Sequence, residues 1–227
     1  MKPWILLDSA PIAGGGEMRL YQHGRDFSIR VGSDELMNSH AHGSEDALAS
    51  LACARLAPAP DHRVLVGGLG MGFTAAAALR AVGPAGRVTV AELLPAVVAW
   101  NRGPLAQVAG DALCDARLQV HQGDVAGLLR SSRAAYDAIL LDVDNGPRAL
   151  SAVTNGWLYS AGGLAAAHRA LRPGGVLAVW SAADDPTFTR RLAQAGFQPE
   201  VISVRGHGTR GAHHVVWVAR ASRPTGG

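Results

Sequence analysis

The stretch VLVGGLGMGFT, residues 64–74, carries four glycines in six positions directly after an apolar run. Gly67, Gly68, Gly70 and Gly72 allow a sharp turn and let backbone N–H groups approach a ligand at the start of the next helix. This signal is weak when taken alone, because a tight strand-to-helix turn without any ligand uses the same residues. Its meaning therefore depends on the segments that follow it.

From residue 63 onward, short apolar stretches alternate with stretches that have helical spacing. Consecutive apolar strands separated by helices are typical of a parallel sheet that is covered on both faces. We expect strands at residues 63–68, 87–92, 117–124, 136–142, 173–182, 197–204 and 212–220, and helices at 72–82, 95–103, 125–132, 157–171 and 185–196.

The last two expected strands are joined by a short glycine-rich stretch with no helix, residues 205–211. They must therefore run antiparallel to each other, which is not how ordinary dinucleotide-binding sheets end. The prediction is an α/β fold with a doubly wound, mostly parallel, seven-stranded Rossmann-like sheet that ends in an antiparallel strand pair.

The first part of the chain has a different texture. Residues 18–39 alternate apolar and polar side chains around glycine turns at 24–25 and 32–33, which indicates short antiparallel strands. A helix is expected at 43–56, with Ser44 as its N-cap. We therefore divide the chain into a small β-strand region, residues 1–42, and a Rossmann-like domain, residues 43–227.

Composition excludes several classes of function. The 227 residues are 48% hydrophobic and 17% charged, which is typical of a globular chain. The net charge is +3, but the basic residues are scattered singly, so we expect no nucleic-acid partner. No apolar run is long enough for a membrane span, so we expect no membrane partner. Cys53 and Cys114 lie far apart in the sequence and are expected to be reduced thiols, which is typical of a cytoplasmic protein.

Two acids follow successive expected strands. Ligands of open α/β sheets bind outside the carboxyl ends of the strands, where Glu92 ends one strand and Asp124 follows the next. Glu92 is positioned to accept hydrogen bonds from ribose hydroxyls, or it is simply an exposed carboxylate at a strand end. Asp124 can accept from an exocyclic amine such as that of adenine, or it can cap the next helix; these two roles are compatible.

Asp142 and Asp144 stand at the end of the most apolar strand, in LLDVDNGP. Carboxylates at such a position are costly to bury unless they have a partner or a role. They could bind a substrate ammonium or take a proton from an amine nucleophile. The alternative is a loop stabilised by turns around Asn145 and Gly146.

The segment NSHAHGSED, residues 38–46, is a further candidate site. His40 and His42 lie on the same side only if the segment is extended, and His40 is our candidate for a base. No third ligand at metal spacing is nearby, so we expect no metal site. These residues could equally be polar loop residues. The histidine-containing stretch 205–214 is expected to form a hairpin loop.

From residue 63 to about 220 the chain resembles the class I S-adenosylmethionine (AdoMet)-dependent methyltransferases. The matching features are the glycine loop, the acid after the second strand, the GD pair at 123–124 and LRPGGVLAV at 171–179. The terminal antiparallel pair also fits that fold. The resemblance implies AdoMet, or a close derivative, as the cofactor.

More narrowly, the chain resembles the spermidine synthase family. Three features occur in the order that this family uses: the N-terminal strands, then ELMNSHAHGSEDALASL (35–51), then GGLGMG (67–72). This resemblance implies that Glu92 and Asp124 hold ribose and adenine, and that Asp142 accepts the amine proton. It further implies a homodimer. The synthases carry an aspartate as the fourth residue of the glycine motif, where it holds the amine of decarboxylated AdoMet, whereas this chain has Gly70.

Three functions follow. The first is an AdoMet-dependent methyltransferase acting on a small, amine-bearing acceptor, with Asp142, Asp144 and His40 orienting that acceptor and taking its proton. The second is an aminopropyltransferase that uses decarboxylated AdoMet and a diamine. The third is a non-catalytic protein that retains the nucleoside pocket. The absence of an acid at Gly70 puts methyl transfer first at this stage.

Overall fold

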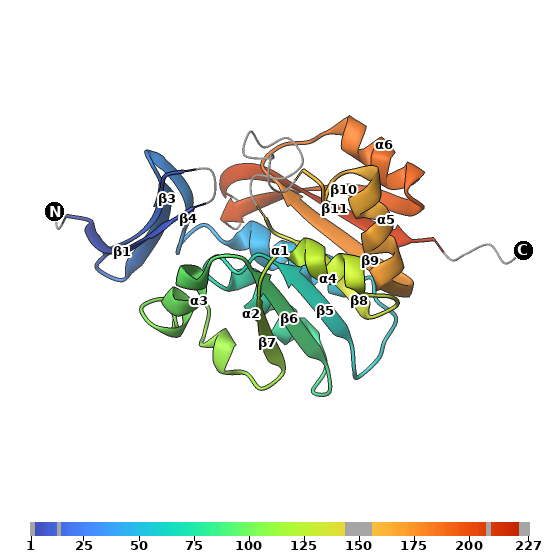
Figure 1. Cartoon of the computed structure of the whole chain (residues 1–227), viewed down its shortest axis with the longest axis horizontal. Helices are drawn as coiled ribbons and strands as arrows, with labels where there is room; N and C mark the ends of the chain where they lie inside the picture. The colour runs from blue at the N-terminus through green and yellow to red at the C-terminus, as the bar shows by residue number, and fades with distance from the viewer. Residues whose placement is uncertain (1–2, 13–14, 144–155, 208–209, 223–227) are drawn as a thin grey trace, which may run out of the picture.

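A seven-stranded sheet forms the centre of the protein (Figure 1). The computed structural model describes residues 3–12, 15–143, 156–207 and 210–222. The strand order is β10-β11-β9-β8-β5-β6-β7, and the five neighbouring strands β9, β8, β5, β6 and β7 are parallel. This confirms the predicted doubly wound fold. β11 runs antiparallel to both β9 and β10, as the missing crossover helix predicts. The strands are β5 (Arg63–Gly67), β6 (Arg87–Glu92), β7 (Leu118–Gln122), β8 (Tyr136–Leu141), β9 (Leu171–Ser181), β10 (Phe197–His207) and β11 (Arg210–Ala221).

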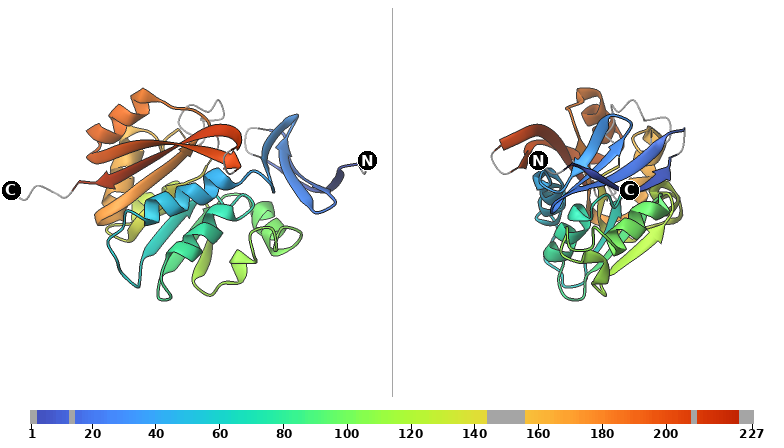
Figure 2. Two further views of the ribbon diagram at one scale, coloured as in Figure 1. Left: turned by 180° about the vertical axis from the view of Figure 1, so that it is seen from behind. Right: turned by 90° about the vertical axis from the view of Figure 1, so that its left-hand side faces the viewer.

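Helices cover both faces of this sheet, which explains why its strands are apolar on both sides (Figures 1 and 2). One apolar core lies between the sheet and α1, α2 and α3, and a second lies between the sheet and α4, α5 and α6. The helices are α1 (Gly43–Cys53), α2 (Phe73–Ala81), α3 (Pro95–Arg102), α4 (Val125–Ser131), α5 (Ala161–Ala170) and α6 (Pro186–Gln194), with a 3₁₀ turn, η1, at Ala112–Cys114.

The N-terminal segment forms an antiparallel four-stranded sheet beside the main one (Figure 1). Its strands are β1 (Ile5–Pro11), β2 (Glu17–His23), β3 (Asp26–Val31) and β4 (Asp34–Asn38). The last three match the expected strands, but β1 was not predicted from the sequence. The indole Nε1 of Trp100 on α3 donates a 2.6 Å hydrogen bond to Asp8 of β1, and Leu20 is fully buried. The division at residue 42 remains a prediction.

Two helix starts differ from the sequence prediction. Ser44 is not the N-cap of α1: that position is His42, and the Ser44 hydroxyl instead donates to the Glu45 carboxylate at 2.5 Å. The fifth long helix begins at Ala161 rather than Trp157, because the Ser160 side chain caps it by accepting from the Gly163 N–H. For α1 the true cap precedes the predicted one, whereas for α5 apolar residues continue on the N-terminal side of the true cap.

Neither described cysteine forms a disulfide. Cys53 is partly buried, and this burial raises its thiol pKa to about 11, while Cys114 is exposed. Cys53 is therefore protonated and unreactive near neutral pH. Within the described residues, no helix combines the length and apolar character needed to cross a membrane.

The second core offers a direct test of the packing. Phe188 is fully buried and packs edge-on against Tyr159 and Trp217, with ring centroids 5.7 and 5.0 Å away. Phe188→Ala is expected to lower the free energy of unfolding by about 3–5 kcal/mol, measured by urea denaturation. Val201→Ala, at a 42% exposed strand position, is the control and should change it by less than about 0.5 kcal/mol. A small loss for Phe188→Ala would contradict this packing.

Candidate functional site

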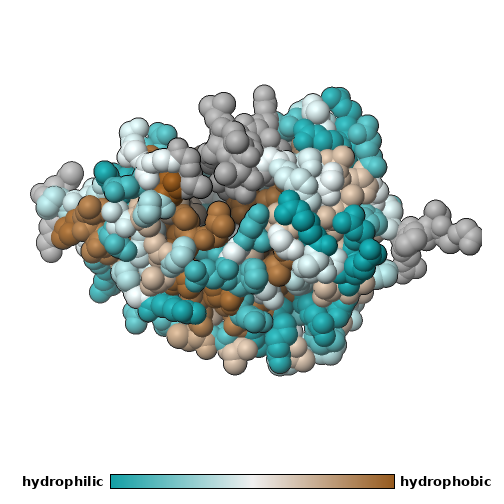
Figure 3. All heavy atoms as spheres, in the orientation of Figure 1, coloured by the Kyte–Doolittle hydropathy of each residue, from teal (hydrophilic) through white to brown (hydrophobic). Residues whose placement is uncertain are grey.

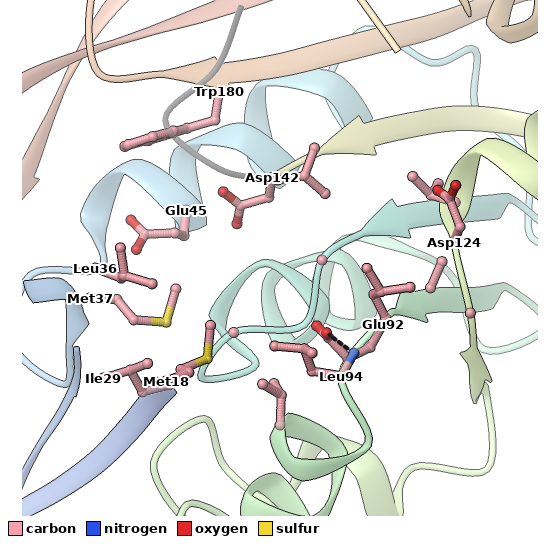
Figure 4. A pocket seen from close by; sticks show the side chains of 18 residues that line it. Met18, Ile29, Leu36, Met37, Glu45, Glu92, Leu94, Asp124, Asp142 and Trp180 are labelled. Atoms are coloured by element: carbon pink, nitrogen blue, oxygen red, sulfur yellow. Dashed lines mark hydrogen bonds between the residues drawn. The ribbon is translucent and has the colours of Figure 1, made fainter. Parts of the chain in front are cut away.

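A cavity of about 270 Å³ opens at the carboxyl edge of the central sheet, facing the N-terminal sheet (Figure 4). It lies where β5 and β8 are neighbours and the strand order reverses, which is the expected ligand position in a doubly wound sheet. Three groups of described residues line it: the glycine loop with Gly68 and Gly70; the four carboxylates of Glu45, Glu92, Asp124 and Asp142; and apolar side chains from both sheets.

Glu92 supports the glycine loop directly. The residue is 8% exposed, and its two carboxylate oxygens accept hydrogen bonds from the Leu69 N–H at 2.9 Å and the Leu94 N–H at 2.8 Å. The second bond is drawn in Figure 4. The sequence predicts a ribose-binding carboxylate here; the structure adds a scaffolding role, since Glu92 joins the turns after β5 and β6. Each oxygen keeps a second lone pair for a ligand.

The glycine loop turns through backbone conformations that only glycine adopts easily. Gly68 and Gly70 have φ values of +91° and +52°. A Cβ at Gly68 would overlap the carbonyl oxygen of Asp142, so the loop lies directly against the end of β8. Of the other predicted glycines, Gly67 ends β5 and Gly72 is the N-cap of α2.

Gly70 lies against the thioether of Met37. A Cβ at Gly70 would stand 2.6 Å from Met37 Cε and 2.9 Å from Sδ. The position where the spermidine synthases carry an aspartate is therefore covered, in this chain, by a methionine from β4. Sequence comparison alone locates the missing acid but not the side chain that takes its place.

Asp124 has one of the two roles that its sequence position allows, and it lies where the other is possible. It caps α4, accepting a 2.8 Å hydrogen bond from the Ala126 N–H, and it also lines the cavity beside Gly123. The predicted contact with an adenine amine is compatible with this cap, because a carboxylate has acceptor sites on both of its oxygens.

Asp142 follows β8 and lines the centre of the cavity. Burial, with a smaller contribution from the negative charge of Glu45, raises the pKa of Asp142 to about 7, against the effect of a 2.6 Å hydrogen bond from the Thr74 hydroxyl. A carboxyl with this pKa can both hold and release a proton near neutral pH. Asp144, the other predicted acid, lies outside the described residues.

Glu45 is a site residue that the sequence interpretation missed. It lies in the first turn of α1, and its carboxylate faces the same space as that of Asp142 (Figure 4). Burial raises the pKa of Glu45 as well, although the Ser44 hydroxyl opposes this. The sequence signal for Glu45 is its position within the candidate segment 38–46, in which the histidines were the predicted functional residues.

Of the histidines of that segment, His42 lies one helical turn before Glu45 and acts on its carboxylate electrostatically, whereas His40 lies apart. His40 Nε2 is 2.8 Å from Asp26 Oδ1, and His40 lines a separate surface hollow together with Trp4 and Glu35. His42 stacks on the Phe73 ring with centroids 4.1 Å apart. The structure does not bring His40 to Asp142, so its position gives no support to the predicted role as a base.

The charge of the cavity lining has one sign. Its described residues include four acids and no lysine, arginine or histidine. Among the residues that the structure describes, no group of three or more histidine, cysteine or acidic side chains could hold a metal ion. The site therefore favours a positively charged ligand, which would lower the cost of keeping several carboxylates close together.

The pKa of Asp142 is testable without any assay of activity. Thr74→Val removes the hydrogen bond to the carboxylate and should raise this pKa above 7, whereas Glu45→Gln removes a negative charge and should lower it. The measurement is a ¹³C NMR titration of the aspartate carboxyls. Asp115, whose pKa is held at about 2 by Arg117, serves as the internal reference. Shifts of the same sign in both variants would contradict the assignment.

The contact between Gly70 and Met37 predicts coupling between these two positions. Gly70→Asp should lower the free energy of unfolding by about 1–3 kcal/mol, because the φ of +52° strains any side chain at this position and the new Cβ also meets the Met37 thioether. In a double-mutant cycle with Met37→Ala, part of this loss should be recovered in the double variant. Strict additivity of the two changes, measured by denaturant unfolding, would show that the side chains do not meet.

Comparison with known proteins agrees with this architecture. No family model matches the sequence, and no curated protein matches it significantly. Among solved structures, a spermidine synthase in complex with the transition-state analogue AdoDATO has a TM-score of 0.74 at 16% identity, over 96% of this chain and 73% of its own. The spermidine synthase from Thermotoga maritima gives 0.75 at 16% identity, with the same coverage.

A probable spermidine synthase from Corynebacterium glutamicum ATCC 13032 has a TM-score of 0.69 at 15% identity, over 97% of this chain and 81% of its own. At these identities the likeness concerns the fold. The chain therefore has the spermidine synthase-like form of the class I AdoMet-dependent methyltransferase fold, as its sequence motifs predict.

Proposed function

We propose that the protein is an aminopropyltransferase, which moves the aminopropyl group of decarboxylated AdoMet to an amine. The observation that carries this proposal is the charge of the cavity: its described lining has four carboxylates and no basic side chain. Decarboxylated AdoMet is a cation without a carboxylate, so every charged group it carries is attracted there. Ordinary AdoMet would bring a carboxylate into the same negative field.

The adenosine part of the donor is assigned to the carboxyl edge of β5, β6 and β7. Glu92 is the acceptor for the ribose hydroxyls and Asp124 for the adenine amine, while Gly68 allows the nucleoside to approach the loop backbone. The hydrogen bonds from Leu69 and Leu94 keep the Glu92 carboxylate oriented before the ligand arrives. This preorganisation lowers the entropy lost on binding.

Glu45 is assigned to the donor ammonium. This chain has Gly70 in place of the acid that the synthases use for this purpose, and Glu45 of α1 offers a carboxylate that lines the same cavity as Met37 (Figure 4). An ammonium–carboxylate contact in a partly buried site is stronger than one at the surface. The change in sequence therefore relocates the amine-binding acid without leaving the pocket neutral.

Asp142 is assigned to the proton of the acceptor amine. The amine nitrogen attacks the carbon bonded to the sulfonium, the carbon–sulfur bond breaks, and the sulfur leaves as the neutral thioether of methylthioadenosine. The proton released from the nitrogen passes to the Asp142 carboxylate. A pKa of about 7 leaves Asp142 largely ionised just above neutral pH and still basic enough to accept this proton.

Methyl transfer from AdoMet is the second candidate, and one observation favours it. Met37 covers the position of the missing acid at Gly70, so the loop itself offers nothing to the donor ammonium. The sequence alone puts this candidate first. The acidic lining, with Glu45 as a second source of the carboxylate, supports the reverse order.

Calorimetry with decarboxylated AdoMet, AdoMet and methylthioadenosine tests the proposal. Decarboxylated AdoMet should bind about tenfold or more tightly than AdoMet, a difference of about 1.4 kcal/mol, and Glu45→Gln should remove most of this preference. Glu92→Ala should weaken all three ligands. Tighter binding of AdoMet would favour methyl transfer. Binding without turnover on amine, hydroxyl and carboxyl acceptors would favour a non-catalytic nucleoside-binding protein.

A further inference from the structure

The cavity has an apolar wall on the side of the N-terminal sheet. Met18 of β2, Ile29 of β3, and Leu36 and Met37 of β4 face it together (Figure 4). In the space-filling view, hydrophobic residues gather where the N-terminal sheet meets the main domain (Figure 3). The proposed reaction leaves this wall without a role, because its binding and proton-transfer groups are all carboxylates.

The wall is partly exposed at its edges. Leu36 is 45% exposed, and Leu93, which lines the same cavity from the turn after β6, is 56% exposed. Large apolar side chains left open beside a cavity are typical of a surface that a ligand covers. The occupant of this part of the cavity is therefore expected to be a hydrocarbon.

No described acid of the N-terminal sheet faces the wall to receive a second positive charge. Glu35, on the same strand as Met37, lines the separate surface hollow instead. Its carboxylate accepts hydrogen bonds from Ser28 Oγ at 2.6 Å and Asn38 Nδ2 at 2.8 Å. At Gly70, the Met37 thioether takes the space that an acidic side chain would need.

We propose that the acceptor is a primary monoamine with an uncharged hydrocarbon tail, not a diamine. This inference rests on the proposed transfer to an amine. The reacting nitrogen lies at Asp142 and the tail lies along the wall of Met18, Ile29, Leu36 and Met37. A second ammonium at the end of the tail would lose its hydration against thioether and methyl groups. Glu45, the acid of α1 that lines this part of the cavity, is already taken by the donor ammonium in the proposed function.

The test compares two acceptors with the same five-carbon chain on the intact protein, with decarboxylated AdoMet as the donor. n-Pentylamine should have a kcat/KM at least tenfold higher than 1,5-diaminopentane. Each methylene added between propylamine and pentylamine should raise kcat/KM about fourfold. This factor corresponds to the transfer free energy of one buried CH₂ group. A preference for the diamine overturns the inference while leaving aminopropyl transfer standing.

The failure of the proposed function has a different signature. If methylthioadenosine binds but neither amine reacts, the proposed transfer is overturned and the inference falls with it. Calorimetry of the two amines in the presence of saturating methylthioadenosine gives a second readout that does not depend on the donor. There too, pentylamine should bind more tightly, and equal or weaker binding overturns the inference.

Variants locate the specificity in the wall. Met37→Glu adds a carboxylate beside the tail and should shift the ratio of kcat/KM values at least tenfold toward the diamine. Val201→Glu makes the same chemical change at a 42% exposed position on β10 outside the cavity lining, and should leave the ratio unchanged. If Met37→Glu does not fold, Leu36→Glu at the exposed edge of the wall replaces it.

One outcome would assign the wall to the donor instead. If Met37→Glu tightens the binding of decarboxylated AdoMet and leaves the ratio between the two amines unchanged, the wall faces the transferred chain. That result overturns the inference of a hydrocarbon-tailed acceptor.

Discussion

The two hydrogen bonds that Glu92 accepts from the backbone hold the site together. One comes from Leu69 in the glycine loop and the other from Leu94, just before α3, so a single buried carboxylate joins the turns that follow β5 and β6. The glycine loop must pass through φ values that side chains disfavour, and it lies against the end of β8. Without the Glu92 carboxylate, the buried Leu69 N–H would lose its partner and the loop its support.

The second constraint is electrostatic. Asp142 and Glu45 both carry raised pKa values because burial penalises their ionised forms, and in Asp142 the nearby charge of Glu45 adds to this. Between the ordinary carboxyl pKa and about 7, the folded protein still holds a proton that the unfolded chain has already released. The free energy of unfolding therefore falls as the pH rises through this range. A bound cation would offset that cost, so the acidic cavity and the proposed cationic donor explain each other.

Much of the fold could be predicted from local pattern. The alternation of apolar strands with helices, and the missing helix before β11, were enough for the sheet and its antiparallel end. β1 was not predicted because Ile5, Leu6 and Leu7 are consecutive apolar residues and show no alternation of apolar and polar side chains. In the structure all three are exposed. The Ser44 cap was wrong because the helix begins at Gly43, so Ser44 lies inside its first turn and its hydroxyl donates to the adjacent Glu45 side chain.

The site was predictable where it depends on strand ends and not where it depends on packing between distant segments. Glu92, Asp124 and Asp142 were named because each follows a strand of one parallel sheet, and all three line the cavity. Met37 and Glu45 come from the N-terminal sheet and α1, and only the folded chain brings them to Gly70 and Asp142. These two residues change the functional interpretation, because Met37 covers the position of the missing acid and Glu45 is the carboxylate that we propose in its place.

The most direct test of the account is a crystal structure of the protein with decarboxylated AdoMet bound. The account predicts that the ribose hydroxyls lie within hydrogen-bond distance of the Glu92 carboxylate and that the donor ammonium lies against Glu45. The sulfonium should face Asp142. A nucleoside bound elsewhere, or a donor ammonium turned away from Glu45 toward solvent, would contradict it.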